Sequence, residues 1–139
     1  MLRRASGIAD GFSLWDDSFE TVAAVEATSD LQRDGAVATE AVARFVEAQR
    51  ERRVFAFLHL YEPHTPYAPP EKHRRHADPY DGEVAYADEL VGRLLGRLRT
   101  VGVYDRAVIA VTSDHGEGLM DHGEQEHGFF LYRGRWRCR

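Results

Sequence analysis

Cysteine and long apolar runs are the most conspicuous absences in this chain of 139 residues. The one cysteine, Cys138, stands next to the last residue, which excludes a disulfide framework and a cysteine-based zinc cluster. No apolar stretch approaches the roughly 20 residues that a membrane-spanning helix requires. Residues 1–7 contain two arginines but no apolar core, so they are unlike a signal peptide. We therefore expect no membrane segment, and the localisation stays unknown.

Lysine is also nearly absent, since 17 of the 18 basic residues are arginine and only Lys72 is lysine. The formal net charge of −5 argues against a nucleic-acid-binding protein of the basic-patch kind. The length and the apolar share of 43% are typical of one globular domain. Nothing in the composition indicates an oligomeric state.

Proline is confined to one part of the chain, because all five prolines lie between Pro63 and Pro79. The run just before it, residues 54–61, is apolar at nearly every position, which predicts a strand buried on both faces. A proline-rich loop has few backbone donors, and long loops in compact domains are usually functional or disordered.

Helical periodicity occurs twice, over residues 34–53 and more clearly over 81–101, and a second apolar strand is predicted at 107–111. The order strand, helix, strand predicts a right-handed βαβ unit with parallel strands, and hence an α/β fold. Both strands would end at the same edge of the sheet. The loop that contains His64 should therefore converge with the turn Asp114–His115.

That turn follows the second predicted strand directly. In α/β folds, the carboxyl ends of parallel strands face the crevice where ligands bind. The carboxylate of Asp114 and the imidazole of His115 would suit a divalent cation there. The alternative is that Asp114 caps the turn and His115 is a surface residue. The preceding strand, the following Gly116 and further histidines downstream favour the metal site.

Two more histidines are candidate catalytic residues. His64 could donate a hydrogen bond to an anionic substrate oxygen or pass a proton to a leaving group, or it could be an exposed loop histidine. His127 could donate to a sulfuryl or phosphoryl oxygen, or could simply anchor its loop. His122 lies between the turn and His127, in a position that suits a supporting role around the cation.

Four segments in the same order resemble the sulfatase family of the alkaline-phosphatase superfamily. They are Ile8–Phe12 with Asp16–Phe19, then Phe57–Tyr67, Tyr80–Asp88 and Thr112–Tyr132. The last of these, TSDHGEGLMDHGEQEHGFFLY, is similar to the family's TSDHGEGLGEHGExEHGFFLY. The resemblance implies a partial alkaline-phosphatase-like (sulfatase) fold, a parallel βαβ core with flanking helices, over residues 1–132.

The resemblance also implies a function. It implies hydrolysis of sulfate esters, a small anionic ester as substrate, and a bound divalent cation, usually Ca²⁺, with Mn²⁺, Zn²⁺ and Mg²⁺ as alternatives. By position, Asp114 and His115 match metal ligands, and His64 matches a histidine that contacts the substrate. His127 matches a cationic group, often lysine in relatives, that contacts the transferring group. Phosphoester or phosphonate monoester hydrolysis is an alternative, because the His form at position 115 also occurs in such enzymes.

Two parts of the family pattern are missing from the chain. The family nucleophile is a formylglycine made within a Cys/Ser-x-Pro-x-Arg motif, and no cysteine or serine here has that context. The acidic doublet that supplies the first metal ligands is missing too. Residues 133–139 contain four arginines where the family continues with an acidic residue and a strand, which suggests a frameshift or a truncated gene model. The alternative there is a genuine basic tail. We therefore expect an internal, inactive fragment with the later half of the active site, or a non-catalytic remnant.

Overall fold

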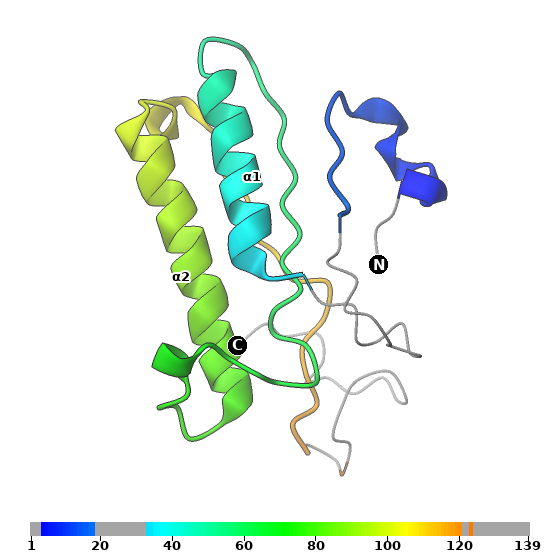
Figure 1. The fold of residues 1–139 in the computed structure, drawn as a ribbon, viewed down its shortest axis with the longest axis vertical. Coiled ribbons are helices and arrows are strands. Elements are labelled where there is room, and N and C mark those ends of the chain that lie inside the picture. Colours follow the sequence, from blue (N-terminus) through cyan, green and yellow to red (C-terminus); the bar gives the residue numbers. More distant parts are fainter. Residues whose placement is uncertain (1–3, 19–32, 121–122, 124–139) are drawn as a thin grey trace. The chain divides into compact units, whose positions relative to one another are not determined.

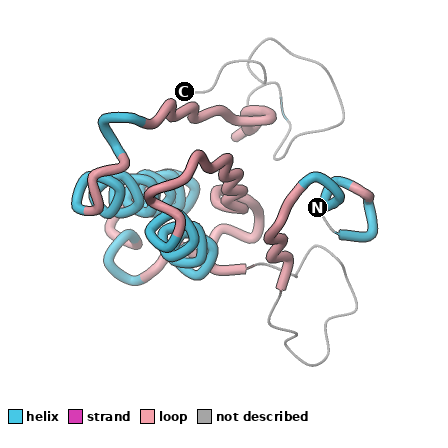
Figure 2. Tube along the Cα trace, turned by 90° about the horizontal axis from the view of Figure 1, so that it is seen from above, coloured by secondary structure: helices cyan, strands magenta, loops and turns pink. Residues whose placement is uncertain are grey.

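The computed structural model describes residues 4–18, 33–120 and 123. The chain divides into two units, residues 1–106 and 107–139, which are described separately below. Regular structure in the described part is helical (Figures 1 and 2). It consists of two α-helices, α1 (Gly35–Ala48) and α2 (Pro79–Thr100), and the short 3-10 helices η1 (Arg4–Ser6), η2 (Ile8–Gly11), η4 (Glu71–His73) and η5 (Tyr104–Arg106).

Helix α1 begins where the sequence offers a side-chain cap. The carboxylate of Asp34 accepts a hydrogen bond from the Ala36 amide at 2.8 Å, which satisfies one of the amide groups that a helix N-terminus leaves without an internal partner. The buried residues of α1 lie three or four positions apart and so share one face of the helix: Gly35, Thr39, Ala43 and Val46. The helix ends at Ala48, before the predicted end at residue 53, and the amide of the following Gln49 donates back to the carbonyls of Phe45 and Val46.

Helix α2 carries start and stop signals at both ends. Asp78 caps it by accepting from the Tyr80 amide at 2.9 Å, and Pro79 occupies the first turn, where no amide donor is needed. At the other end, Gly102 has a φ of +70°, which glycine adopts without strain. The Val103 amide then bonds to the Leu98 carbonyl, as in a Schellman motif. The predicted helix over 81–101 is thus confirmed, with its start two residues earlier.

The two helices lie side by side and run in the same direction (Figure 1). Near their N-termini, the Tyr86 hydroxyl donates to Asp34 at 2.7 Å. Near their C-termini, Arg97 pairs with Glu47 at 2.6 Å. The apolar core of the described residues is small and lies largely on these helices: Ala9, Ala43, Val46, Tyr86, Leu90 and Leu98.

The prediction of a parallel βαβ core is wrong for the part of the chain that the structure describes. None of the described residues is in a strand, and residues 53–62 and 107–113 are drawn as loop in Figure 2. Several of their apolar side chains are exposed: Phe55 is 74% exposed and Val108 is 100% exposed. An apolar run predicts extended backbone and a need for burial, but a strand exists only through hydrogen bonds to a neighbouring strand. The expected convergence of the two motifs rested on that sheet and loses its basis.

No helix in the described ranges has the length and apolar character that crossing a membrane requires. The basic stretch at residues 133–139 lies outside the described residues.

Candidate functional site

The first part of the candidate site is the proline-rich loop between residues 62 and 70. His64 stands between two cis peptide bonds, Glu62–Pro63 and Thr65–Pro66. Its imidazole stacks on Tyr61, with ring centroids 4.4 Å apart and an interplanar angle of 23°. His64 is half-buried, so it is not a fully exposed loop histidine.

The position of the proton on the His64 ring follows from its hydrogen bond. The Nδ1 atom lies 2.7 Å from the carbonyl oxygen of Thr65. A carbonyl oxygen only accepts, so Nδ1 carries the hydrogen and donates it. In the neutral ring the lone pair is then on Nε2, which can accept a proton. In the imidazolium form Nε2 becomes a donor suited to an anionic oxygen.

A buried carboxylate lies behind this loop. Glu83, on the first turns of α2, is only 5% exposed. Its Oε2 accepts from the His64 amide at 3.1 Å and its Oε1 from the Ala68 amide at 2.7 Å. Burial raises the pKa of the Glu83 carboxyl, the two amide hydrogen bonds oppose that rise, and the nearby charge of Glu62 adds to it.

Sequence reasoning missed Glu83, because an acid in the first turn of a helix is explained by the helix dipole alone. A signal was present nevertheless. Glu83 lies three and seven residues before Tyr86 and Leu90, both buried, so its carboxylate stands on the apolar face of α2. A carboxylate in that position needs hydrogen-bond donors from another segment.

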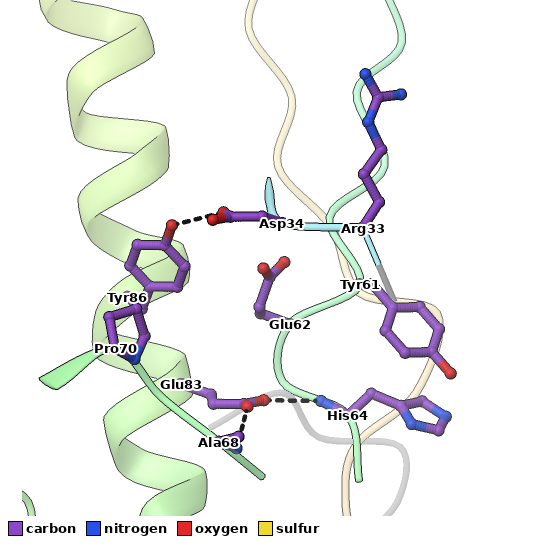
Figure 3. A pocket seen from close by; sticks show the side chains of 9 residues that line it. All are labelled: Arg33, Asp34, Tyr61, Glu62, His64, Ala68, Pro70, Glu83 and Tyr86. Carbon is purple, nitrogen blue, oxygen red and sulfur yellow. Dashed lines mark hydrogen bonds between the residues drawn. The ribbon is translucent and has the colours of Figure 1, made fainter. Parts of the chain in front are cut away.

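The loop borders a pocket of about 220 Å³ (Figure 3). Its lining residues are Arg33, Asp34, Tyr61, Glu62, His64, Ala68, Pro70, Glu83 and Tyr86. Glu62 Oε1 accepts from the Gly35 amide at 2.9 Å at the start of α1, and its Oε2 is buried without a hydrogen-bond partner among the described residues. The three carboxylates make the pocket interior unsuited to a doubly charged anion. The imidazole of His64 points away from the carboxylates of Glu62 and Glu83 (Figure 3).

The second part of the candidate site, Asp114 and His115, belongs to the other unit. The carboxylate of Asp114 accepts from the His115 amide at 3.0 Å, and its side chain is 81% exposed. The His115 ring is held by its Nδ1, which lies 2.9 Å from the Gly116 carbonyl oxygen and must therefore donate to it. The ring lone pair is then on Nε2, 3.8 Å from Asp114 Oδ1.

These two residues fit a divalent cation as part of its ligand set. A carbonyl that fixes one ring nitrogen is the usual outer partner of a metal-binding histidine. Bonds of about 2.0–2.6 Å from a cation to each donor can span the 3.8 Å between Nε2 and Oδ1. Among the described residues, however, no group of three or more histidine, cysteine or acidic side chains gathers around one point. Two donors alone do not complete the coordination shell of such a cation.

The remaining candidate residues are not placed. His127 and His122 lie outside the described residues. The prediction that the His64 loop meets the Asp114–His115 turn stays untested.

Comparison with known proteins gives the family. The sulfatase family profile matches residues 5–137. The chain belongs to the sulfatase family. Human iduronate 2-sulfatase is 37% identical over 75 residues, which are 54% of this chain and 14% of that protein. The mouse iduronate 2-sulfatase is 36% identical over 75 residues, 54% of this chain and 13% of the relative. No solved structure matches.

Family membership confirms the resemblance seen in the sequence. It makes the chain part of a hydrolase family, and this family generally uses a divalent metal. The matched segment spans about one seventh of the human relative, so the activity of a complete protein is a proposal.

Proposed function

We propose that this chain carries the later half of a sulfatase active site, which serves the metal-dependent hydrolysis of a small sulfate ester. The observation that supports this best is the Asp114–His115 turn within a sulfatase-family match. Its carboxylate and the Nε2 of its imidazole are close enough to serve one cation, and the ring is already oriented by Gly116.

Asp114 and His115 would hold the cation, for which Ca²⁺ is our first choice and Mn²⁺, Zn²⁺ and Mg²⁺ are alternatives. Once bound, the cation would supply Lewis-acid stabilisation of negative charge at the ester. Because Nδ1 of His64 donates to Thr65, we assign the chemistry to Nε2. His64 would therefore contact a substrate oxygen, or protonate the leaving oxygen, as imidazolium through Nε2. His127 would be a second donor to the transferring group.

The chain is not expected to turn over substrate by itself. It contains no Cys/Ser-x-Pro-x-Arg motif from which the family nucleophile is made. Covalent catalysis needs such an activated nucleophile, and binding groups alone do not replace it. We expect the purified chain to show no hydrolysis of an aryl sulfate. Calcium-dependent turnover by the purified chain would contradict the inactive-fragment proposal.

Metal binding tests the ligand assignment directly. Calcium should raise the melting temperature of the chain, because a ligand that binds only the folded state stabilises it. Asp114→Ala should abolish that increase, since even outer partners of a metal site are worth about 10–100-fold in affinity. Asp88→Ala, which removes an exposed carboxylate of α2, is the matched control and should leave the increase intact. An equal increase in all three proteins would reject Asp114 as a ligand.

A second candidate function is phosphoester or phosphonate monoester hydrolysis on the same scaffold. The observation that favours it is the histidine at position 115 itself, which also occurs in such superfamily members. Titration with inorganic sulfate and with inorganic phosphate, followed through the His64 ring signals, separates the two. Tighter binding of phosphate would favour the second candidate, and binding of neither anion would indicate a non-catalytic remnant.

A further inference from the structure

We propose that Glu83 is a positioning residue for His64: its buried carboxylate holds the backbone of the loop that presents the imidazole. The importance of His64 rests on the proposed function, whereas the role of Glu83 in the loop rests on geometry alone. Glu83 accepts two amide hydrogen bonds from residues four positions apart, at 3.1 Å from His64 and 2.7 Å from Ala68.

The loop has few amide hydrogens with which to hold its backbone. Four of residues 63–70 are prolines, so only His64, Thr65, Tyr67 and Ala68 have an amide hydrogen to donate. Glu83 accepts two of these four hydrogens. Hydrogen bonds to an ionised acceptor are roughly twice as strong as neutral ones, and burial strengthens them further. One carboxylate thus accounts for half of the donors of the segment.

The same loop packs closely on α2 next to Glu83. A Cβ atom at Gly82 would lie 2.8 Å from the carbonyl oxygen of His73, in η4, and 2.9 Å from Cγ of Pro69, in the loop, so both segments lie close against this glycine. Tyr67 packs edge-on against Tyr80, with ring centroids 5.5 Å apart. These contacts place the loop against a rigid helix, and Glu83 is the charged side chain through which that helix reaches the His64 amide (Figure 3).

Each Glu83 oxygen accepts one amide hydrogen, so in this arrangement the carboxylate is engaged with the loop backbone. It acts on chemistry only through His64. The imidazole itself points away from Glu83, and its Nδ1 is bonded to Thr65, the next residue of the same loop (Figure 3). The Thr65 carbonyl oxygen is the acceptor that keeps the hydrogen on Nδ1. A change in the loop backbone would move this oxygen and so weaken the preference for the Nδ1–H tautomer.

Nuclear magnetic resonance of the full chain tests this without catalysis. In wild type, the His64 and Ala68 amides should exchange slowly with solvent, and the neutral His64 ring should carry its hydrogen on Nδ1. Glu83→Gln retains the shape of the side chain but replaces one acceptor by a donor. We expect at least one of the two amides to lose about tenfold or more in protection, the equivalent of one net hydrogen bond of ~1.4 kcal/mol. The His64 ring should shift towards the Nε2–H tautomer.

Two controls belong in the same experiment. Asp88→Asn removes an exposed charge from the same helix and should change neither amide nor the ring. The ring of His73 bonds to Glu89 through Nε2 at 2.7 Å and does not contact Glu83 through a hydrogen bond. Its signals should stay constant in Glu83→Gln, and a change in them would indicate that the fold around α2 is disturbed.

The proposal is overturned if the two amides exchange freely in wild type, or if Glu83→Gln leaves both their protection and the His64 tautomer unchanged. If Glu83→Gln fails to fold, the exchange rates of the His64 and Ala68 amides in wild type still test the two hydrogen bonds to Glu83. Addition of inorganic sulfate separates this proposal from the proposed function. If the two amides are protected but the His64 signals do not change on addition of sulfate, the proposed contact between His64 and an anion is rejected and the role of Glu83 is retained.

Discussion

At the level of single residues, close contacts restrict Gly35, the first residue of α1. A Cβ atom there would lie 2.7 Å from Leu90 Cδ1 and 2.8 Å from Glu62 Oε2. Leu90 is 1% exposed and Glu62 is bonded to the Gly35 amide, so neither side chain can move away cheaply. We predict that Gly35→Ala lowers the free energy of unfolding by about 1–3 kcal/mol, the usual cost of overpacking.

Chemical denaturation measures this loss, and Gly92→Ala is the matched control. A Cβ atom at Gly92, inside α2, would meet nothing within 4 Å. That substitution should therefore stabilise the protein by about 0.5–1 kcal/mol through helix propensity. Equal effects of the two substitutions would refute the close contact at Gly35.

Asp16 provides a prediction for the dependence of stability on pH. The hydrogen bond from Arg33, at 2.7 Å, and that from Ser18 lower its pKa from 3.8 to about 2. A carboxyl whose pKa is lower in the folded state stabilises the fold above its unfolded pKa, and this contribution is lost as pH falls. Wild type should thus be more stable than Asp16→Asn at pH 7, and the difference should vanish between pH 3.8 and about 2. Denaturation of both proteins at several pH values checks it, and a constant difference would contradict it.

At the level of elements, the start of α1 carries more than an ordinary cap. Asp34 Oδ1 accepts both the Ala36 amide and the buried Tyr86 hydroxyl, at 2.8 and 2.7 Å. Among the described residues, the carboxylate of Asp78, the cap of α2, accepts only from the Tyr80 amide. We predict that Asp78→Ala costs about 1 kcal/mol. Asp34→Ala should cost about 2–3 kcal/mol, because it also leaves the buried Tyr86 hydroxyl without its acceptor.

The comparison is made by chemical denaturation of both variants, with Tyr86→Phe as the control. That substitution removes the hydroxyl together with its need for a partner. Asp34→Ala in the Tyr86→Phe background should then cost no more than a simple cap. If the cost of Asp34→Ala is the same in both backgrounds, the two helices are not coupled through this hydrogen bond.

The helices were predictable from sequence and the strands were not, for a physical reason. The bounds of α2 depend on residues within it and just beyond it: Asp78, Pro79 and Gly102 act locally. The segments at 53–62 and 107–113 are apolar enough to be strands, but pairing depends on residues far away in the chain. Among the described residues no segment supplies that pairing.

At the level of the whole molecule, the difference between local and long-range determinants also applies to the candidate site. The ligand and proton-donor roles of Asp114, His115 and His64 stay predictions, which rest on residue types and local turns alone. Glu83 was not predicted, because its role depends on a loop 15 to 19 residues earlier in the chain that folds back onto α2. The meeting of the His64 loop with Asp114–His115 was deduced from a sheet that the described residues do not form.

We predict that the exposed extended segments make the chain self-associate. Val108 and Val111, on the segment at 107–113, are 100% and 75% exposed. Extended apolar backbone without a paired neighbour is a template for contact between chains, and lysine on such an edge blocks it. Burial of one valine is worth about 1.5–3 kcal/mol, so replacing both valines with lysine should weaken association by at least tenfold.

The measurement is sedimentation velocity over a range of protein concentrations, with Val37→Lys as the control. Val37 is 53% exposed, but it lies on α1, where the helix itself satisfies the backbone hydrogen bonds. If association came from exposed apolar area alone, Val37→Lys would weaken it as well. We expect it to leave association nearly unchanged, because the unpaired backbone at 107–113, together with its valines, provides the contact. A monomeric wild type at all concentrations would refute the prediction, and an equal effect of Val37→Lys would refute its mechanism.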